Sequence, residues 1–316
     1  MSSIGLLPSQ SLTKAGQKVL RHHFHDFLKQ ESGVRLGNDI EAVHDMRVAA
    51  RRMRATLRIF EKGFSPKELK FLTKGLRQTA KILGSVRDLD VFIEKLTIYQ
   101  HKFPLAEQIG IAPLSEYCDL QRNEARAKML MYLESEAYKK FKIKTAHFLN
   151  KDIQTDDSFS IKPFPNQIQH VAPVLIYERY EALRAYEPFL LDASVELLHQ
   201  LRIDFKYFRY TLENFHDILG NESGVVLANV KEIQNHLGDL NDAKVACLFL
   251  KNFLHNWKHY RKSLATTRSK KPSAIVDYLN VKLAEKELLL NTFPSVWHQF
   301  NSTNLRLNLA LSISIL

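Results

Sequence analysis

Five arginines stand close together in the segment HDMRVAARRMRATLRIF, residues 44–60, where Asp45 is the only acid. They are Arg47, Arg51, Arg52, Arg54 and Arg58. A guanidinium group donates paired hydrogen bonds whose geometry matches phosphate oxygens, so this composition suits the binding of phosphate groups. Like charges three or four residues apart on a helix cost about 0.2–0.5 kcal/mol per pair. A run of charge on one helix is usually no more than a solvated face, so this single segment leaves both interpretations open.

Helical periodicity separates the charged residues from the apolar ones. At about 100° per residue, one basic stripe spans about 80° of the helix surface and holds His44, Arg47, Arg51, Arg54 and Arg58. Met46, Met53 and Leu57 belong to a separate apolar face, and Arg52 lies off the basic stripe. The stripe is about 21 Å long, at about 1.5 Å per residue. The segment therefore predicts a helix with a core face beside a basic face.

The same pattern recurs in the second part of the chain. The segment HQLRIDFKYFRYTLENF, residues 199–215, is identical to residues 44–60 at six of seventeen positions, with an offset of 155. Downstream, LGSVRDLDV at 83–91 matches LGDLNDAKV at 237–245 with an offset of 154. The second basic stripe holds His199, Arg202, Lys206 and Arg209, whereas Glu213 replaces Arg58. This recurrence predicts a duplicated helical unit and favours an anion site over a solvated face.

The elements that position these stripes are predicted to be helices throughout. The 316 residues include only 11 glycines and 10 prolines, and long stretches have a period near 3.6 without strand-like alternation. Expected helices cover roughly 10–31, 38–61, 66–83, 86–101, 113–149, 170–187, 193–217, 222–236, 239–257 and 273–299. We expect a single all-α domain, 1–316, with internal repeats at about 10–150 and 166–300 and a linker at 151–165.

The paired motifs HDMRVAARRMR with LGSVRDLDV, and LHQLRIDFKYFRYTLE with LGDLNDA, resemble the CHAD family, the conserved histidine α-helical domain. The resemblance extends from about residue 10 to about residue 300. It implies two tandem four-helix bundles related by a pseudo-two-fold axis, with a basic central channel. It also implies binding of inorganic polyphosphate, often at polyphosphate granules in bacteria.

Carried over to this chain, the resemblance implies a polyphosphate site made by both repeats. The implied ligands of the first repeat are His44, Arg47, Arg51, Arg54, Arg58, Arg77 and Lys81. Those of the second are His199, Arg202, Lys206, Arg209 and Lys231. The second repeat is the weaker contributor because Glu213 and Asn235 stand opposite Arg58 and Lys81. Whether the two stripes face each other across one channel stays open.

Two other clusters suggest metals, and for each we favour another explanation. The segment RHHFHDF, residues 21–27, contains three histidines, but their spacing matches no structural zinc pattern. The aspartates of the repeated motifs fit helix caps better than a Mg²⁺ site, since each follows a glycine and a capping residue: Gly84, Ser85 and Asp88, then Gly238, Asp239 and Asp242. We expect no metal, no cofactor and no catalytic residue.

Charge and composition limit the remaining choices. Lys+Arg 45 against Asp+Glu 34 gives a net charge of +11, which favours anionic partners. Two distant cysteines, no secretory signal and no span of about 20 apolar residues predict a soluble cytoplasmic protein that binds no membrane. The apolar C-terminal tail is either a packed end or a truncated terminus. Two alternatives to polyphosphate binding remain: nucleic-acid binding, supported by Tyr207 and Tyr210, and a metal-dependent phosphohydrolase that uses Asp88 and Asp242.

Overall fold

The part of the chain that the computed structural model describes consists of helices joined by turns and loops. This part comprises residues 3–37, 39–104, 108–151, 166–263 and 272–316, and it contains no β-strand. The prediction of an all-α fold is thus confirmed. The predicted linker, 151–165, lies outside the described residues except for Lys151.

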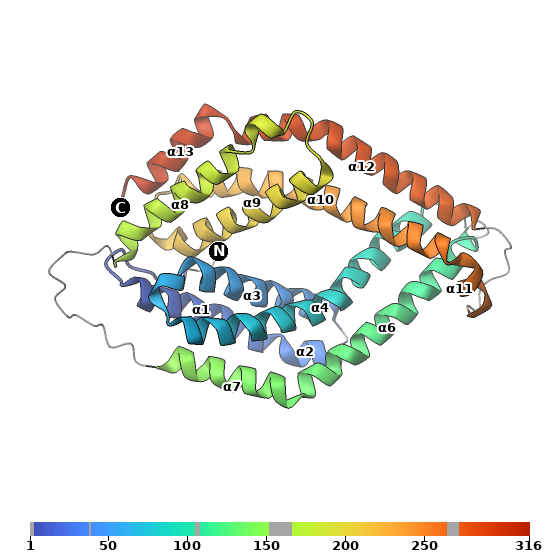
Figure 1. The fold of residues 1–316 in the computed structure, drawn as a ribbon, viewed down its shortest axis with the longest axis horizontal. Coiled ribbons are helices and arrows are strands. Elements are labelled where there is room, and N and C mark those ends of the chain that lie inside the picture. Colours follow the sequence, from blue (N-terminus) through green and yellow to red (C-terminus); the bar gives the residue numbers. More distant parts are fainter. Residues whose placement is uncertain (1–2, 38, 105–107, 152–165, 264–271) are drawn as a thin grey trace.

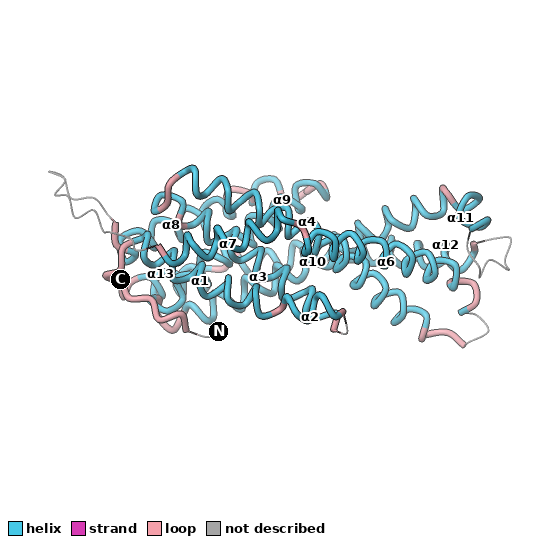
Figure 2. The backbone as a smooth tube through the Cα atoms, turned by 90° about the horizontal axis from the view of Figure 1, so that it is seen from below, coloured by secondary structure: helices cyan, strands magenta, loops and turns pink. Residues whose placement is uncertain are grey.

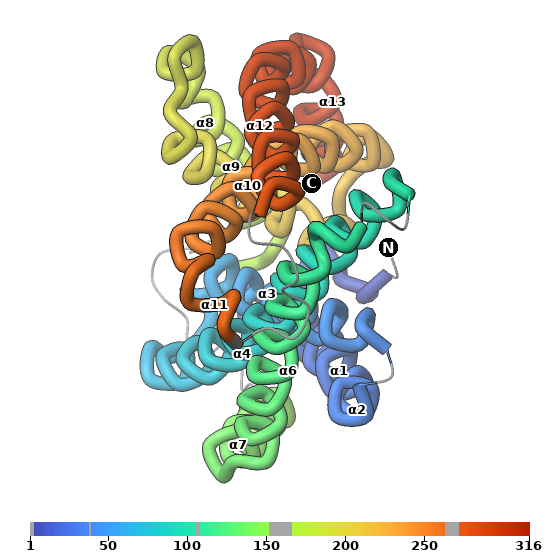
Figure 3. Tube along the Cα trace, turned by 90° about the vertical axis from the view of Figure 1, so that its right-hand side faces the viewer, coloured from blue at the N-terminus to red at the C-terminus, as the bar shows by residue number. Residues whose placement is uncertain are grey.

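The helices form two groups that follow the chain order (Figures 1 and 3). The first comprises α1 Leu12–Lys29, α2 Glu31–Leu36, α3 Ile40–Ile59, α4 Pro66–Gln100, α6 Ala112–Glu134 and α7 Glu136–Asn150. The second comprises α8 Ile168–Arg184, α9 Val195–Phe215, α10 Ser223–His255, α11 Trp257–Ser263, α12 Ser273–Phe300 and α13 Thr303–Ile313. Short 3₁₀ turns occupy Glu61–Gly63 (η1), Glu187–Phe189 (η2) and His216–Ile218 (η3).

Serine caps set where several of these helices begin. The side chains of Ser11, Ser65, Ser194 and Ser302 each accept a hydrogen bond from a backbone N–H in the first turn of the helix that follows. Pro66 occupies the first position of α4, where a missing N–H costs nothing.

Each half buries the apolar face that its sequence predicts. In the first half, Met46, Met53 and Leu57 of α3 are almost fully buried in one cluster. In the second half, Phe205 and Phe208 of α9 occupy another cluster, which also takes in side chains from the start of the chain. The structure does not test whether the two halves arose by duplication, so that inference stays a prediction.

A third hydrophobic cluster joins the two halves at the end of the molecule far from the termini (Figure 2). The C-terminal turns of α4 and α10 meet there with α6 and α12, and they bury Tyr99, Cys118, Phe253 and Tyr278. The rings of Tyr99 and Tyr278, one from each half, lie 4.4 Å apart between centroids. The halves are therefore held together by a shared core as well as by the contact of α3 with α9.

The predicted breaks at Gly84 and Gly238 are wrong. Helix α4 runs without interruption through Gly84, and α10 runs through Gly238. Neither glycine has the positive φ that a C-terminal cap requires. Ser85 is no N-cap, since its hydroxyl donates to the Lys81 carbonyl one turn earlier, at 3.1 Å. Helical packing on both sides of each glycine thus outweighs the local capping signal.

The structure also shows a helix break that the sequence does not predict, and a helix in the C-terminal tail. The single helix expected at 113–149 is broken at Ser135, whose hydroxyl accepts from Tyr138 N–H at 3.3 Å and caps α7. The C-terminal tail forms α13 and packs Leu305 and Leu309 into the core of the second half. Among the described helices, none has a stretch long and apolar enough to cross a bilayer.

Candidate anion-binding site

Helices α3 and α9, which carry the two basic stripes, pack against each other at the centre of the molecule (Figure 1). A buried hydrogen bond joins them, from the Thr56 hydroxyl to the Asn214 side-chain oxygen at 3.0 Å. The rings of Phe60 and Phe215, at the C-terminal ends of the two helices, are in contact with centroids 5.4 Å apart and an interplanar angle of 53°. This contact fixes the register in which one stripe meets the other.

The stripes form one surface, which we call the basic face: Arg47 and Arg51 from α3, with Arg202, Lys206 and Arg209 from α9. Burial is the first cause that lowers the pKa of Lys206, and the charges of Arg202, Arg51, Arg47 and Arg209 lower it further, to about 7. Burial also lowers the pKa of Arg51 and of Arg202, and in each case cations of the opposite helix contribute. Cations of the two helices therefore lie close enough to lower one another's pKa, whereas a channel between the two stripes stays a prediction.

The basic face holds guanidinium groups without a carboxylate partner. In the described part of the chain, no carboxylate lies within ion-pair distance of Arg51, Arg202 or Lys206. The Nε atoms of Arg51 and Arg202 are buried and have no hydrogen-bond partner there. Buried donors without partners are rare in folded proteins, and at a functional site they are typical of groups that await a ligand.

The rings of two tyrosines on α9 make cation–π contacts with three of the arginines. The ring of Tyr210 lies 5.2 Å from the Arg209 guanidinium carbon and 5.9 Å from that of Arg51. The Tyr207 ring lies 4.2 Å from the Arg58 guanidinium carbon, which brings Arg58 of α3 onto α9. Tyr210 is buried and Tyr207 is half-buried, so both rings are engaged within the protein.

Acidic side chains border the basic face at its edges. Asp88 of α4 pairs with Arg47 at 3.3 Å, and Asp242 of α10 pairs with Lys95 of α4 at 3.0 Å. Glu213 lies between two arginines, 3.8 Å from Arg52 and 3.4 Å from Arg209. Glu213 thus neutralises part of the second stripe, as its position in the sequence predicts.

The two motif histidines occupy matching places but make different contacts. His199 is exposed, and its Nδ1 lies 2.9 Å from the Asn241 side-chain oxygen. His44 is half-buried, and burial first, then the charge of Arg87, lowers its pKa. Arg87 and Asn241 stand at equivalent repeat positions, 154 residues apart. His199 therefore contacts α10, whereas His44 lies near enough to α4 for the charge of Arg87 to lower its pKa.

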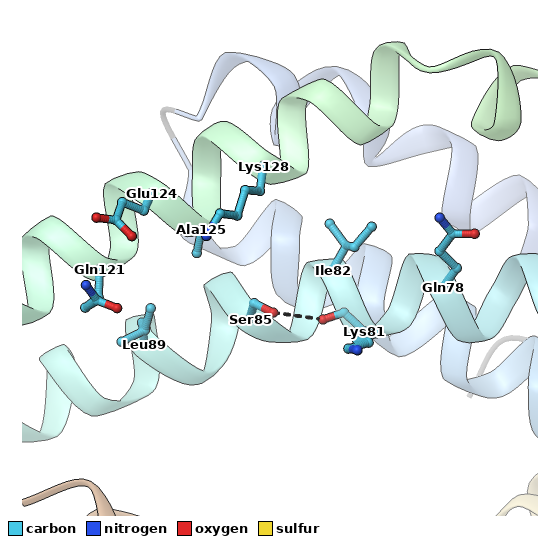
Figure 4. A pocket seen from close by; sticks show the side chains of 9 residues that line it. All are labelled: Gln78, Lys81, Ile82, Ser85, Leu89, Gln121, Glu124, Ala125 and Lys128. Atoms are coloured by element: carbon cyan, nitrogen blue, oxygen red, sulfur yellow. Dashed lines mark hydrogen bonds between the residues drawn. The ribbon is translucent and has the colours of Figure 1, made fainter. Parts of the chain in front are cut away.

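The outer expected ligands lie on the long helices. Arg77, Lys81 and Asp88 lie within about 40° of one another around the axis of α4. They therefore share one side of this helix, from which Asp88 pairs with Arg47. On α10, Lys231 and Asp242 share one side of the helix in the same way, because they have the same spacing as Arg77 and Asp88. The side chains of Arg77, Lys81 and Lys231 are all exposed. Lys81 also borders a groove of about 470 Å³ between α4 and α6 (Figure 4). No contact joins these three residues to the basic face among the described residues, so their part in the site stays a prediction.

The aspartates proposed for metal chemistry are held by cations instead. Asp88 and Asp242 pair with Arg47 and Lys95, and neither belongs to a group of three potential ligands among the described residues. Arg87, Lys95 and Asn241 were missed by the sequence interpretation, since their roles depend on packing between helices that no local motif reveals.

Comparisons with known proteins identify the family and the fold of the chain. The CHAD domain family model matches residues 18–251. The fold is similar to the crystal structure of the CHAD domain from the plant Ricinus communis, with a TM-score of 0.72 and 21% identity over 93% of each chain. It is also similar to PptA from Streptomyces chartreusis, with a TM-score of 0.64 and 18% identity over 91% of this chain and 99% of that one. No curated protein matches the sequence significantly. Because the family model spans most of the sequence, the chain belongs to the CHAD family.

Proposed function

We propose that this protein binds inorganic polyphosphate on the basic face and does so without catalysis. The observation that carries the proposal is the convergence of two basic stripes, with Arg51, Arg202 and Lys206 lacking carboxylate partners in the described part. Each stripe offers charges at intervals of about one helical turn, which suits a polymer with a negative charge on every repeat unit. The proposed setting is the cytoplasm, at polyphosphate granules.

The tyrosines favour a polymer without bases. Proteins that hold single-stranded nucleic acid stack bases on exposed aromatic rings. Here the face of Tyr210 is covered by Arg51 and Arg209, and Tyr207 lies against Arg58. Nucleic acid would therefore gain only phosphate contacts on this surface, without the base stacking that strengthens its binding to single-strand binding proteins.

The ion pairs of Asp88 and Asp242 support binding without hydrolysis. A phosphohydrolase that uses Asp88 and Asp242 needs carboxylates free to hold a cation such as Mg²⁺. Both carboxylates form ion pairs with Arg47 and Lys95. Incubation of polyphosphate with the protein and Mg²⁺ or Mn²⁺ should leave chain length and free phosphate unchanged. Release of phosphate that Asp88→Asn abolishes would replace binding by hydrolysis as the function.

The test of the binding itself is a competition. Polyphosphate is titrated against the purified chain in a series of salt concentrations, with single-stranded DNA and RNA as competitors at equal phosphate concentration. We expect affinity to fall steeply with salt, because each neutralised phosphate releases counterions, and to resist the nucleic acids. Displacement by DNA or RNA at equal phosphate concentration would favour nucleic-acid binding.

A further inference from the structure

A second cluster of polar side chains lines a pocket of about 190 Å³ that adjoins the basic face, since Tyr210 and Glu213 contact both. The pocket is bounded by α1, by Arg52 of α3 and by the residues around the end of α9. Three side chains of α1 converge on it: His22, His23 and Asp26. Each offers one potential metal ligand atom, and the three atoms lie within 4.8 Å of one another.

The spacing on α1 brings these side chains together. Positions 22 and 26 are one turn apart, and position 23 is three residues from 26, so all three share one side of the helix. The Nε2 atom of His22 lies 3.6 Å from the Asp26 carboxylate. The interpretation from sequence considered the histidines without Asp26, and it therefore missed the set that the helix assembles.

His23 supplies an independent observation. Its side chain is only 9% exposed, it faces the pocket, and its Nδ1 atom has no hydrogen-bond partner in the described part of the chain. Buried polar atoms almost always have a partner, so this nitrogen calls for one. A neutral imidazole, the form that burial favours, is a strong ligand for divalent transition metals.

The charge around the pocket attracts cations, although the whole chain carries +11. Three carboxylates line the pocket, those of Asp26, Glu213 and Asp217, against the single guanidinium of Arg52. Arg52 opposes a bound cation, but it lies 3.8 Å from Glu213, which offsets its charge. Asp217 is already used, since it accepts from the backbone N–H groups of residues 4 and 6. Asp26 therefore remains the carboxylate placed to act as a ligand.

We propose that His22, His23 and Asp26 form a binding site for a divalent transition-metal ion such as Zn²⁺. Two imidazole nitrogens with one carboxylate oxygen are the ligand set that zinc accepts in three-residue sites, where water completes the coordination.

The experiment uses the full chain, freed of metal with a chelator and studied without phosphate. Zn²⁺ is titrated calorimetrically, and Co²⁺ is added as a probe whose visible spectrum reports nitrogen and oxygen ligands. We expect one ion per chain and a Tm that rises with Zn²⁺ concentration. Replacing His23 would also change the packing of α1, so the more exposed His22→Ala and Asp26→Asn carry the test. Each should weaken binding by about tenfold or more.

The matched control is His170→Ala, which removes an exposed histidine from α8 and should leave the affinity unchanged. Two outcomes would overturn the proposal: absence of binding at one ion per chain, or unaltered affinity in both His22→Ala and Asp26→Asn. The second outcome would assign the bound metal to histidines elsewhere on the surface.

Discussion

Lys206 is the residue through which pH should act on the basic face. Its pKa is about 7, because burial and the neighbouring arginines disfavour its charged form. A bound polyanion favours the charged form and raises that pKa, so binding takes up a proton above about pH 7. We predict that affinity for polyphosphate falls as pH rises from about 6 to about 8.5, by at most about tenfold per pH unit.

Calorimetry in buffers of different ionisation enthalpy measures this proton uptake directly. The matched variant is Lys206→Arg, which keeps the charge at every pH and should flatten the profile. A wild-type profile as flat as that of Lys206→Arg would show that Lys206 is already charged, or that it takes no part in binding.

Glu213 is the residue whose negative charge should weaken the binding of polyphosphate to the unsubstituted protein. Its carboxylate, whose side chain is 10% exposed, lies beside both Arg52 and Arg209. Glu213→Gln keeps the size of the side chain and frees the two guanidinium groups. We predict polyphosphate affinity about three- to tenfold higher, equivalent to about 0.7–1.4 kcal/mol. A weaker complex in this variant would mean that Glu213 orients Arg209 rather than competing with phosphate.

At the scale of the element, the long helix α10 gives the sharpest test of the fold. Gly238 is helical, and a Cβ added there would meet no other atom within 4 Å. We predict that Gly238→Ala raises the free energy of unfolding by about 0.5–1 kcal/mol, because alanine is the better helix former. Chemical denaturation measures the change. A decrease of similar size in the free energy of unfolding would instead indicate that Gly238 ends a helix, as the sequence predicts.

Gly84 in α4 differs from Gly238 because the side chain of Arg47 lies close to it, so substitutions there are expected to affect binding. A Cβ there would lie 3.4 Å from Arg47 Nε, which alanine tolerates but a longer side chain does not. We predict that Gly84→Leu displaces the Arg47 guanidinium and lowers polyphosphate affinity, whereas Gly84→Ala preserves it. Titration of both variants checks this. Equal affinities would remove Arg47 from the binding surface.

The sequence predicts the elements well where side-chain periodicity decides them, and poorly where two signals compete. The apolar and basic faces of α3 and α9 are where the pattern puts them. The breaks at Gly84 and Gly238 are wrong because a glycine followed by a capping residue is typical of a helix end, yet packing along α4 and α10 keeps both helices continuous. Only contacts between elements settle such a conflict.

At the scale of the whole molecule, the shared cluster at the far end was not predictable. Its side chains come from α4, α6, α10 and α12, and no motif marks which helices meet. We predict that Phe253→Ala lowers the free energy of unfolding by about 3–5 kcal/mol, through the cavity that it leaves. Leu248→Ala, at an exposed position of the same helix, should change it by less than about 0.5 kcal/mol. Equal small effects would mean that the halves are not joined there.

The central claim for the whole molecule is that one binding event uses both halves. The decisive measurement is polyphosphate affinity, across a salt series, for Arg51→Glu in α3 and Lys206→Glu in α9. Lys140→Glu, on the exposed surface of α7, makes the same change in net charge away from the site. We predict that each site variant weakens the same event by about 10- to 100-fold and reduces the salt slope by about 1 or more. Lys140→Glu should match the wild type. Unaltered affinity in either site variant would contradict a single basic face shared by the two halves.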